Sequence, residues 1–271
     1  MPLLSIVIAN FNFGRFLEDA IKSVLSQGEQ EDVELIICDA ASSDNSVSVI
    51  RKYEDRIAWW CSEPDGGQSE AFNKGFLHAK GKYLTWLNAD DIMVAGCLAR
   101  ILHELECHPE CEWFTGNHFR VDAWGDVLSV GWGPHIYPMW AQRRCSPLVV
   151  FGPSTIFAKS LLERMGGFDE RMHLMMDTDL WKRFVVAGVK QRRINCFIWI
   201  FRMHEKSKTA EFGGHVLDEN KRQQFERERK MSIEKTGYHP SRLLRLFGLA
   251  MRVVDGSAFV ALFLKLTMRK S

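Results

Sequence analysis

The chain has 271 residues, of which 46% are hydrophobic and 25% are charged, proportions that are typical of a globular domain. Its formal net charge of +1 argues against a general nucleic-acid-binding protein. The seven cysteines are odd in number and lack a disulfide-like spacing. The first residues lack a signal-peptide pattern, and no apolar run reaches the roughly 20 residues of a membrane span. We therefore expect a cytoplasmic protein.

The first third of the chain alternates strand and helix patterns. Residues 4–9 are an apolar strand pattern, residues 17–25 repeat apolar side chains at helical spacing, and residues 33–38 are a second apolar strand that ends at Asp39. Since a strand–helix–strand crossover joins parallel strands, the pattern predicts an α/β fold with a Rossmann-like, mostly parallel sheet flanked by helices. The elements expected next are a helix to about residue 53, a strand over 57–60, a helix over 71–76 and a strand over 83–87.

The later part of the chain is less regular. The alternation stops near residue 210, so we expect one domain over residues 1–214 and a charged, then amphipathic, helical C-terminal extension over residues 215–271. Residues 131–147 are irregular, and a loop of that length is often functional. The elements expected before residue 210 are a helix over 95–105, strands over 112–116, 119–122 and 127–130, helices ending at Gly166 and beginning at Asp177, and a strand over 194–201.

Two adjacent carboxylates, Asp90 and Asp91, follow the predicted strand over residues 83–87. Carboxylates at the end of a buried strand repel each other and are costly to desolvate, and a divalent cation removes that cost. Mg²⁺ and Mn²⁺ favour carboxylate oxygens and bridge to phosphates, and ligands of open α/β sheets lie beyond the carboxyl ends of the strands. The stretch therefore indicates either a metal–phosphate site or a solvated turn in which Asp91 caps the next helix.

Four polar clusters each follow a predicted strand or open a predicted helix. They are Asp39, Asp90-Asp91, Asp177-Thr178-Asp179 and Arg202-Met203-His204. With the segments around them, these clusters resemble the family 2 glycosyltransferases with the GT-A fold, in the branch that builds bacterial surface polysaccharides. The resemblance covers about residues 3–210 and implies that residues 1–214 are the GT-A domain.

The motifs that carry the resemblance are weak singly and specific in this order. They are Ser5-Ile6-Val7-Ile8 with the helix up to Gln27, Asp39-x-x-Ser42-x-Asp44-x-Ser46, Ser62-Glu63-Pro64-Asp65-x-Gly67-Gln68, Asn73-Lys74-Gly75, Asn88-Ala89-Asp90-Asp91, Gly166-Gly167-Phe168-Asp169-Glu170 and Asp177-x-Asp179-Leu180-Trp181-x-Arg183. The chain departs from the family at Ala40, where Gly is usual, and at Glu70, where Asp is frequent. Neither departure removes a proposed catalytic group.

The resemblance implies a role for each cluster. Asp39 is expected to contact the nucleobase, Asp90 the ribose or a water molecule on the metal, and Asp91 to ligate Mn²⁺ or Mg²⁺, with His204 as a further ligand. Asp177 is expected to be the general base that takes a proton from the acceptor hydroxyl. Other residues expected to bind the nucleotide sugar are Asn10, Asp65, Gln68, Lys74, Asn88, Arg202 and Lys208. A second interpretation makes Asp39 and Asp177 helix caps, Asp179 the base and His204 an ordinary loop residue.

The function that the resemblance implies is inverting, metal-dependent transfer of a sugar from a nucleoside diphosphate, expected to be UDP, to a hydroxyl of a surface polysaccharide or a lipid-linked oligosaccharide. Two alternatives are a nucleotidyltransferase and a non-catalytic scaffold that binds nucleotide sugars. The first would need a Gly-rich, basic loop directly after the first strand, where residues 10–15 read Asn-Phe-Asn-Phe-Gly-Arg. The second would predict loss of the carboxylates, and all are present.

The residues from 241 to 271 combine basic and apolar side chains in an amphipathic pattern. This pattern is typical of a helix on an anionic membrane surface, which would place the protein at the inner face of the plasma membrane; the alternative is a helix pair packed on the domain or on a second subunit. Trp132 and Trp140 are candidates for stacking on a sugar, whereas Trp59, Trp60, Trp113 and Trp199 are expected mostly in the core. A further alternative is a zinc site made of His103, Cys107, His108 and Cys111.

Overall fold

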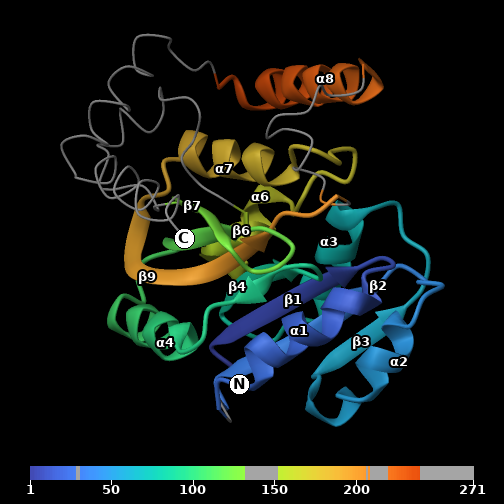
Figure 1. Cartoon of the computed structure of the whole chain (residues 1–271). Coiled ribbons are helices and arrows are strands. Elements are labelled where there is room, and N and C mark those ends of the chain that lie inside the picture. The colour runs from blue at the N-terminus through green and yellow to red at the C-terminus, as the bar shows by residue number, and fades with distance from the viewer. Residues whose placement is uncertain (29–30, 132–151, 206, 208–218, 239–271) are drawn as a thin grey trace.

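The structure is a computed structural model, and it describes residues 1–28, 31–131, 152–205, 207 and 219–238. A nine-stranded sheet is flanked by helices, and α8 packs against α7 at the top of Figure 1. The strands are β1 (Leu4–Asn10), β2 (Val33–Asp39), β3 (Trp59–Ser62), β4 (Tyr83–Asn88), β5 (Ile92–Met93), β6 (Trp113–Val121), β7 (Val127–Gly131), β8 (Thr155–Ala158) and β9 (Gln191–Arg202). The helices are α1 (Gly14–Leu25), α2 (Ser46–Arg51), α3 (Gln68–His78), α4 (Cys97–Cys107), α6 (Lys159–Met165), α7 (Met176–Val186) and α8 (Glu219–Thr236), with 3₁₀ turns η1 (Glu54–Arg56) and η2 (Gly152–Ser154).

The strand order brings the ends of three strands together at one edge of the sheet. The order is β3-β2-β1-β4-β8-β6-β9-β5, and β7 pairs with β6. β1 runs parallel to β2 and β4, with Asn10 opposite Asp39 and Ala9 opposite Asn88. Because ligands of open α/β sheets bind beyond the carboxyl ends of the strands, this edge is the place to look for a site.

The second half of the sheet is mixed. β8 is antiparallel to both β4 and β6, β6 is parallel to β9, and β5 is antiparallel to β9. The predicted α/β fold with helices around the sheet is confirmed; β1, β2, β3 and β4 form its continuous parallel part, and β6 and β9 add one further parallel pair.

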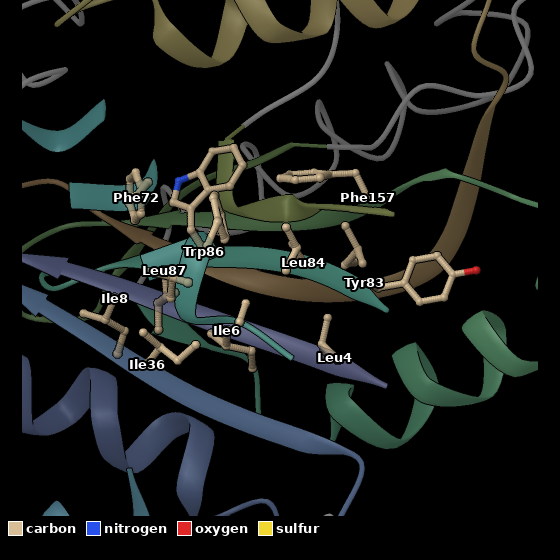
Figure 2. Packing of buried hydrophobic residues seen from close by; sticks show 14 of the residues in the cluster. Leu4, Ile6, Ile8, Ile36, Phe72, Tyr83, Leu84, Trp86, Leu87 and Phe157 are labelled. Atoms are coloured by element: carbon tan, nitrogen blue, oxygen red, sulfur yellow. The ribbon is translucent and has the colours of Figure 1, made fainter. Parts of the chain in front are cut away.

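The core lies between the sheet and the helices packed on it (Figure 2). Trp86 of β4 stacks on Trp181 of α7, with ring centroids 5.7 Å apart, so this pair joins the two halves of the chain. Gly75 lets α3 approach β1 closely, because a Cβ there would lie 2.4 Å from a methyl carbon of Val7. The apolar side chains of β1 without exposed surface are Leu4, Ile6, Val7 and Ile8.

Two strands predicted over residues 112–116 and 119–122 are one strand, β6. Its register against β9 shifts between Thr115 and Asn117, so an irregularity at Gly116 interrupts the strand pattern without ending the strand. A side chain at Gly116 would also collide with Ile198, since a Cβ would lie 2.8 Å from that side chain. The two-residue strand β5 was not predicted, because so short an element leaves no periodicity to detect.

The structure agrees with some of the remaining expectations, argues against one and does not describe the residues of others. Trp113 and Trp199 are buried and Trp59 and Trp60 are partly buried, as expected for core tryptophans. In the part of the chain that the structure describes, no three His, Cys, Asp or Glu side chains gather as a metal site, which argues against the zinc reading. Nor does any helix there combine the length and the apolar character needed to cross a membrane. Trp132, Trp140, the boundary at residue 214 and the segment 241–271 lie outside the described residues.

Candidate active site

Asn10 and Asp39 join the ends of β1 and β2. Asn10 Nδ2 donates to Asp39 Oδ1 at 2.6 Å, and the hydroxyl of Ser42 donates to the same oxygen at 2.5 Å. Asp39 Oδ2 accepts from the Ser42 backbone N–H at 3.0 Å and from the Ser62 hydroxyl at 2.6 Å. Asp39 is only 1% exposed, so its carboxylate is engaged in holding the loop after β2 rather than open to a nucleobase.

The loop after β1 carries an exposed aromatic side chain that the sequence reasoning missed. Asn12 adopts a left-handed backbone conformation, with φ of 58°, and its Oδ1 accepts the N–H of Ser43 at 2.8 Å. These contacts tie the loop after β1 to the loop after β2. Phe11, between the two asparagines, is 59% exposed, so its ring is accessible at the end of β1. The sequence feature that could have indicated this residue is a phenylalanine flanked by asparagines at the end of a predicted strand.

The loop before α3 contributes Asp65, and α3 itself contributes Gln68 and Lys74. Gln68 Nε2 donates to Asn88 Oδ1 at 2.7 Å, which ties the start of α3 to the end of β4. Asp65 accepts the N–H of Gly67 at 2.9 Å, and partial burial raises the pKa of its carboxyl. Lys74 forms an ion pair with Glu63 at 2.9 Å, which raises the pKa of the lysine.

Asp91 connects β4 to β9 and has no exposed surface. Its Oδ2 accepts from Asn88 Nδ2 at 2.6 Å, and its Oδ1 accepts the backbone N–H of Arg202 at 3.0 Å. Burial, followed by the charge of Asp90, raises the pKa of Asp91 well above its ordinary range. Both oxygens of Asp91 thus accept hydrogen bonds and its side chain has no exposed surface, which disfavours direct ligation of a metal by Asp91 in this arrangement.

Asp90 faces His204 instead. Asp90 Oδ2 lies 3.0 Å from His204 Nε2, and the Asp90 side chain keeps 13% of its surface exposed. Phe16 of α1 packs against the imidazole, with ring centroids 4.7 Å apart, and the guanidinium of Arg202 lies 4.8 Å from the centroid of the same phenyl ring. Arg202 also reaches Asp19 at 3.4 Å. Thus Phe16 holds an imidazole and a cation beside Asp90.

The Asp90–His204 pair fits a divalent cation bound together with a substrate. Asp90 Oδ2 and His204 Nε2 lie at hydrogen-bond distance, 3.0 Å, so the two atoms are close enough to bind one cation together. Mg²⁺-type ions are commonly held by one or two protein side chains plus substrate phosphates. Asp91 follows Asp90 directly in the chain, and both of its oxygens already accept hydrogen bonds. Lys208, also expected to bind the nucleotide sugar, lies outside the described residues.

Asp177 lies in the first turn of α7, beside β4. Its Oδ1 accepts the backbone N–H of Thr178 at 2.6 Å, and burial raises the pKa of its carboxyl. A Cβ on Gly152 would lie 3.5 Å from Asp177 Oδ2 and 3.3 Å from the Trp86 ring, so Asp177 sits near the strand that ends at Asn88. No described residue donates a hydrogen bond to Oδ2.

Asp179 is a structural residue and not an open base. It has no exposed surface, and its Oδ2 accepts from Arg183 Nε at 2.9 Å and lies 3.5 Å from Lys235 Nζ. Arg183 in turn donates to the backbone carbonyls of Met165 and Gly167. The alternative in which Asp179 accepts the acceptor proton is therefore disfavoured.

Solved structures define the class of protein to which this fold belongs. The mannosyltransferase PcManGT from Pyrobaculum calidifontis, in complex with GDP-Man and Mn²⁺, matches 95% of this chain and 75% of its own, with a TM-score of 0.61 and 15% identity. S. aureus TarS 1-349, in complex with UDP-GlcNAc, matches 80% of this chain and 62% of its own, with a TM-score of 0.61 and 13% identity. The fold is that of GT-A glycosyltransferases.

The sequence places the chain within that class. The model of the family described as Glycosyl transferase family 2 matches residues 5–163, and the chain belongs to this family. An uncharacterized glycosyltransferase of Mycobacterium tuberculosis is 37% identical over 174 residues, 62% of this chain and 63% of the relative. One of Rickettsia prowazekii is 27% identical over 195 residues, 68% of this chain and 58% of the relative. The chain thus spans about three fifths of the length of these relatives.

Proposed function

We propose that this protein is an inverting, metal-dependent glycosyltransferase that moves a sugar from a UDP-sugar to a hydroxyl of a surface polysaccharide or of its lipid-linked precursor. The observation that carries the proposal is the Asp90–His204 pair at 3.0 Å, next to Arg202 and at the end of a GT-A sheet. A carboxylate and an imidazole suit a divalent cation, and a neighbouring guanidinium suits a diphosphate.

The nucleotide would bind over the loops after β1 and β2. Phe11, 59% exposed, offers an aromatic face for the nucleobase. Asp39 contributes indirectly, because its hydrogen bonds with Ser42 fix the loop that starts at Ala40. Gln68 and Asn88, linked at 2.7 Å, are the groups proposed to face the ribose. UDP-GlcNAc in one fold neighbour supports UDP, whereas GDP-Man in the other makes GDP the comparison to run.

The metal site that we propose consists of Asp90 and His204, with Asp91 behind them as the residue that fixes the end of β4 to β9. A bound Mn²⁺ or Mg²⁺ would stabilise the negative charge that grows on the diphosphate as the glycosidic bond breaks. Arg202, held over Phe16, adds a fixed positive charge for the same diphosphate.

Asp177 is proposed as the general base. Its raised pKa makes it a better proton acceptor than an ordinary aspartate, and its Oδ2 is open among the described residues. The carboxylate would take the proton of the acceptor hydroxyl while that oxygen attacks the anomeric carbon from the face opposite the diphosphate. One displacement of this kind inverts the configuration at that carbon.

The decisive experiment is a thermal-shift screen of UDP- and GDP-sugars, each with and without Mn²⁺ or Mg²⁺, followed by nucleoside diphosphate release in the presence of candidate glycan acceptors. A UDP-sugar that raises the melting temperature only with metal would support the donor assignment. Binding without any release of nucleoside diphosphate over a broad acceptor panel would instead favour the non-catalytic scaffold.

The segment 241–271 is proposed to hold the protein at an anionic membrane surface, where a lipid-linked acceptor would lie. The proposal rests on its basic and apolar composition alone. Removing the segment should move the protein from the membrane fraction to the supernatant in a vesicle sedimentation assay with anionic lipid. Equal sedimentation of both forms would contradict it.

A further inference from the structure

Helix α8 places one buried carboxylate against the chain that leads into α7. Glu228 is 3% exposed. Its Oε1 accepts the backbone N–H of His173 at 3.0 Å, and its Oε2 accepts those of Leu174 at 2.8 Å and Met175 at 3.0 Å. One side chain thus binds three consecutive peptide groups from more than 50 residues away in the sequence.

These peptide groups belong to the N-cap residue of α7, Met175, and to the two residues before it. α7 begins at Met176, and its N-cap residue, Met175, offers no side-chain cap. Asp, Asn, Ser or Thr at that position would normally accept an N–H from within the same helix. Glu228 of α8 instead fixes the chain just before the helix, and its buried carboxylate is tolerated because three N–H groups compensate for its lost hydration.

The segment bound by Glu228 also contacts the proposed donor side. The hydroxyl of Ser69, near the start of α3, donates to the carbonyl of Met172 at 2.6 Å. A Cβ on Gly67 would lie 3.1 Å from His173 Nδ1, so the loop before α3 and the loop before α7 are in contact. Asp177 is two residues beyond the last N–H that Glu228 accepts. A change in the position of this segment would therefore move Asp177.

α8 makes further contacts with the domain, some polar and one through Met231, which packs against the hydrophobic core. Lys235 pairs with Asp169 at 3.0 Å, and the hydrogen bond from Arg171, followed by that from Lys235, lowers the pKa of Asp169. Lys182 of α7 donates to the buried hydroxyl of Ser232 at 3.1 Å. These contacts dock α8 (Figure 1), but Glu228 is the α8 side chain that holds the start of α7.

We propose that Glu228 is a positioning residue for Asp177, so that α8 is part of the machinery of sugar transfer although it lies outside the segment that the family model matches. The inference rests on the proposed role of Asp177 as the base. By fixing the backbone of residues 173–175, Glu228 holds the Asp177 carboxylate in its partly buried place and in line with the acceptor hydroxyl. Misplacement of a catalytic group by about 1 Å is enough to lower a rate about 100-fold.

The test compares three variants of the full chain with the wild type. Glu228→Gln keeps the size of the side chain but replaces one acceptor oxygen with an amide group that donates, so it repels at least one of the three N–H groups. Glu226→Gln changes an exposed carboxylate on the same helix, which pairs only with Arg229 among the described residues. Ser232→Ala removes the partner of Lys182 and loosens α8 without touching residues 173–175.

We expect Glu228→Gln to lower kcat at least tenfold, with the KM for the donor changed less than threefold. We also expect the acid limb of its pH–kcat profile to move to lower pH, because an Asp177 that is more exposed to water has a pKa closer to the ordinary value. Burial raises the pKa of Asp177, and the hydrogen bonds from Thr178 lower it. Glu226→Gln should behave as wild type. Ser232→Ala should lower the melting temperature but keep the wild-type pH profile.

Two results would overturn the inference. One is a Glu228→Gln enzyme with the wild-type kcat and acid limb; the other is an equal loss of kcat in Ser232→Ala, which would mean that α8 acts through stability alone. Should Glu228→Gln not fold, Glu228→Asp gives the same readings, since it keeps the charge and shortens the reach. Asp177→Asn is assayed alongside: if it transfers at the wild-type rate, the proposed base is wrong, whereas an inactive Asp177→Asn beside an unaffected Glu228→Gln refutes the positioning role only.

Discussion

The donor side and the base side of the candidate site are built in different ways. On the donor side, β1, β2 and β4 are neighbours in a parallel sheet, so their last residues, Asn10, Asp39 and Asn88, lie at one edge. On the base side, Asp177 lies in the first turn of a helix, and the peptide groups just before that helix are held by Glu228, 51 residues beyond Asp177 in the chain. Strand register thus fixes the first group of residues, whereas docking of a separate helix fixes the second.

This difference predicts which changes act on binding and which act on the rate. Changes on the donor side should weaken nucleotide binding. Changes on the base side should leave nucleotide binding intact and slow transfer, because no residue of α7 belongs to the proposed nucleotide contacts.

The largest effect is expected from Asp177→Asn. The amide cannot accept the acceptor proton, so kcat should fall by about 100- to 10,000-fold, the usual contribution of a general base. The dissociation constant of the donor, measured by calorimetry with Mn²⁺, should stay within about threefold of wild type. Asp179→Asn is the matched comparison: it disturbs the Arg183 pair and should lower stability more than turnover. Near wild-type transfer by Asp177→Asn would refute the assignment.

The second prediction separates the two adjacent carboxylates. Asp90→Ala should remove the metal dependence of donor binding, since it deletes one of two proposed ligands, and should leave the melting temperature nearly unchanged. Asp91→Ala should lower stability by about 1–3 kcal/mol for each buried group left unpaired, namely the Arg202 N–H and the Asn88 amide. Metal titrations of the donor complex and thermal melts of the free proteins measure both. The reverse pattern would restore Asp91 as the ligand.

The third prediction concerns the exposed aromatic at the donor edge. Phe11→Ala should weaken UDP binding by about 1–3 kcal/mol, the usual worth of base–aromatic stacking, with little change in kcat at saturating donor. Leu77→Ala is the control, because Leu77 is also exposed, at 81%, but lies at the far end of α3. Isothermal calorimetry with UDP and Mn²⁺ compares the two. Equal affinities for Phe11→Ala and wild type would exclude Phe11 from the base site.

The sequence predicts the donor side better than it predicts the base side, for physical reasons. The strand patterns before Asp39 and Asn88 determine where those residues lie, because the carboxyl ends of parallel neighbours share an edge. The sequence favours Asp91 as the metal ligand, whereas the geometry favours Asp90. The two carboxylates are adjacent in the sequence, so only their different burial distinguishes them. The link from Glu228 to α7 left no pattern to read, since long-range hydrogen bonds to backbone N–H groups need no particular residues at 173–175.

The smallest expected effect concerns stability and also depends on Asp177. Burial raises the pKa of this carboxyl, so its protonated form is favoured in the folded state; the stability this contributes is full below the unfolded pKa and is lost as pH rises through the folded pKa. Near pH 7 the ionised carboxylate therefore costs stability that an amide does not. Asp177→Asn should raise the melting temperature at pH 7 by a few degrees, on the order of 1 kcal/mol.

The sign of this effect makes it a sharp check on the environment of the base. The gain from Asp177→Asn should shrink as the pH is lowered through the raised pKa of the wild-type carboxyl, and thermal melts at several pH values would follow it. The Asp90→Asn variant serves as the comparison, since Asp90 keeps an exposed edge beside His204. A destabilised Asp177→Asn at pH 7 would mean that the carboxylate makes favourable contacts as an ion, and an ion held in that way would be a poorer proton acceptor than the proposed mechanism requires.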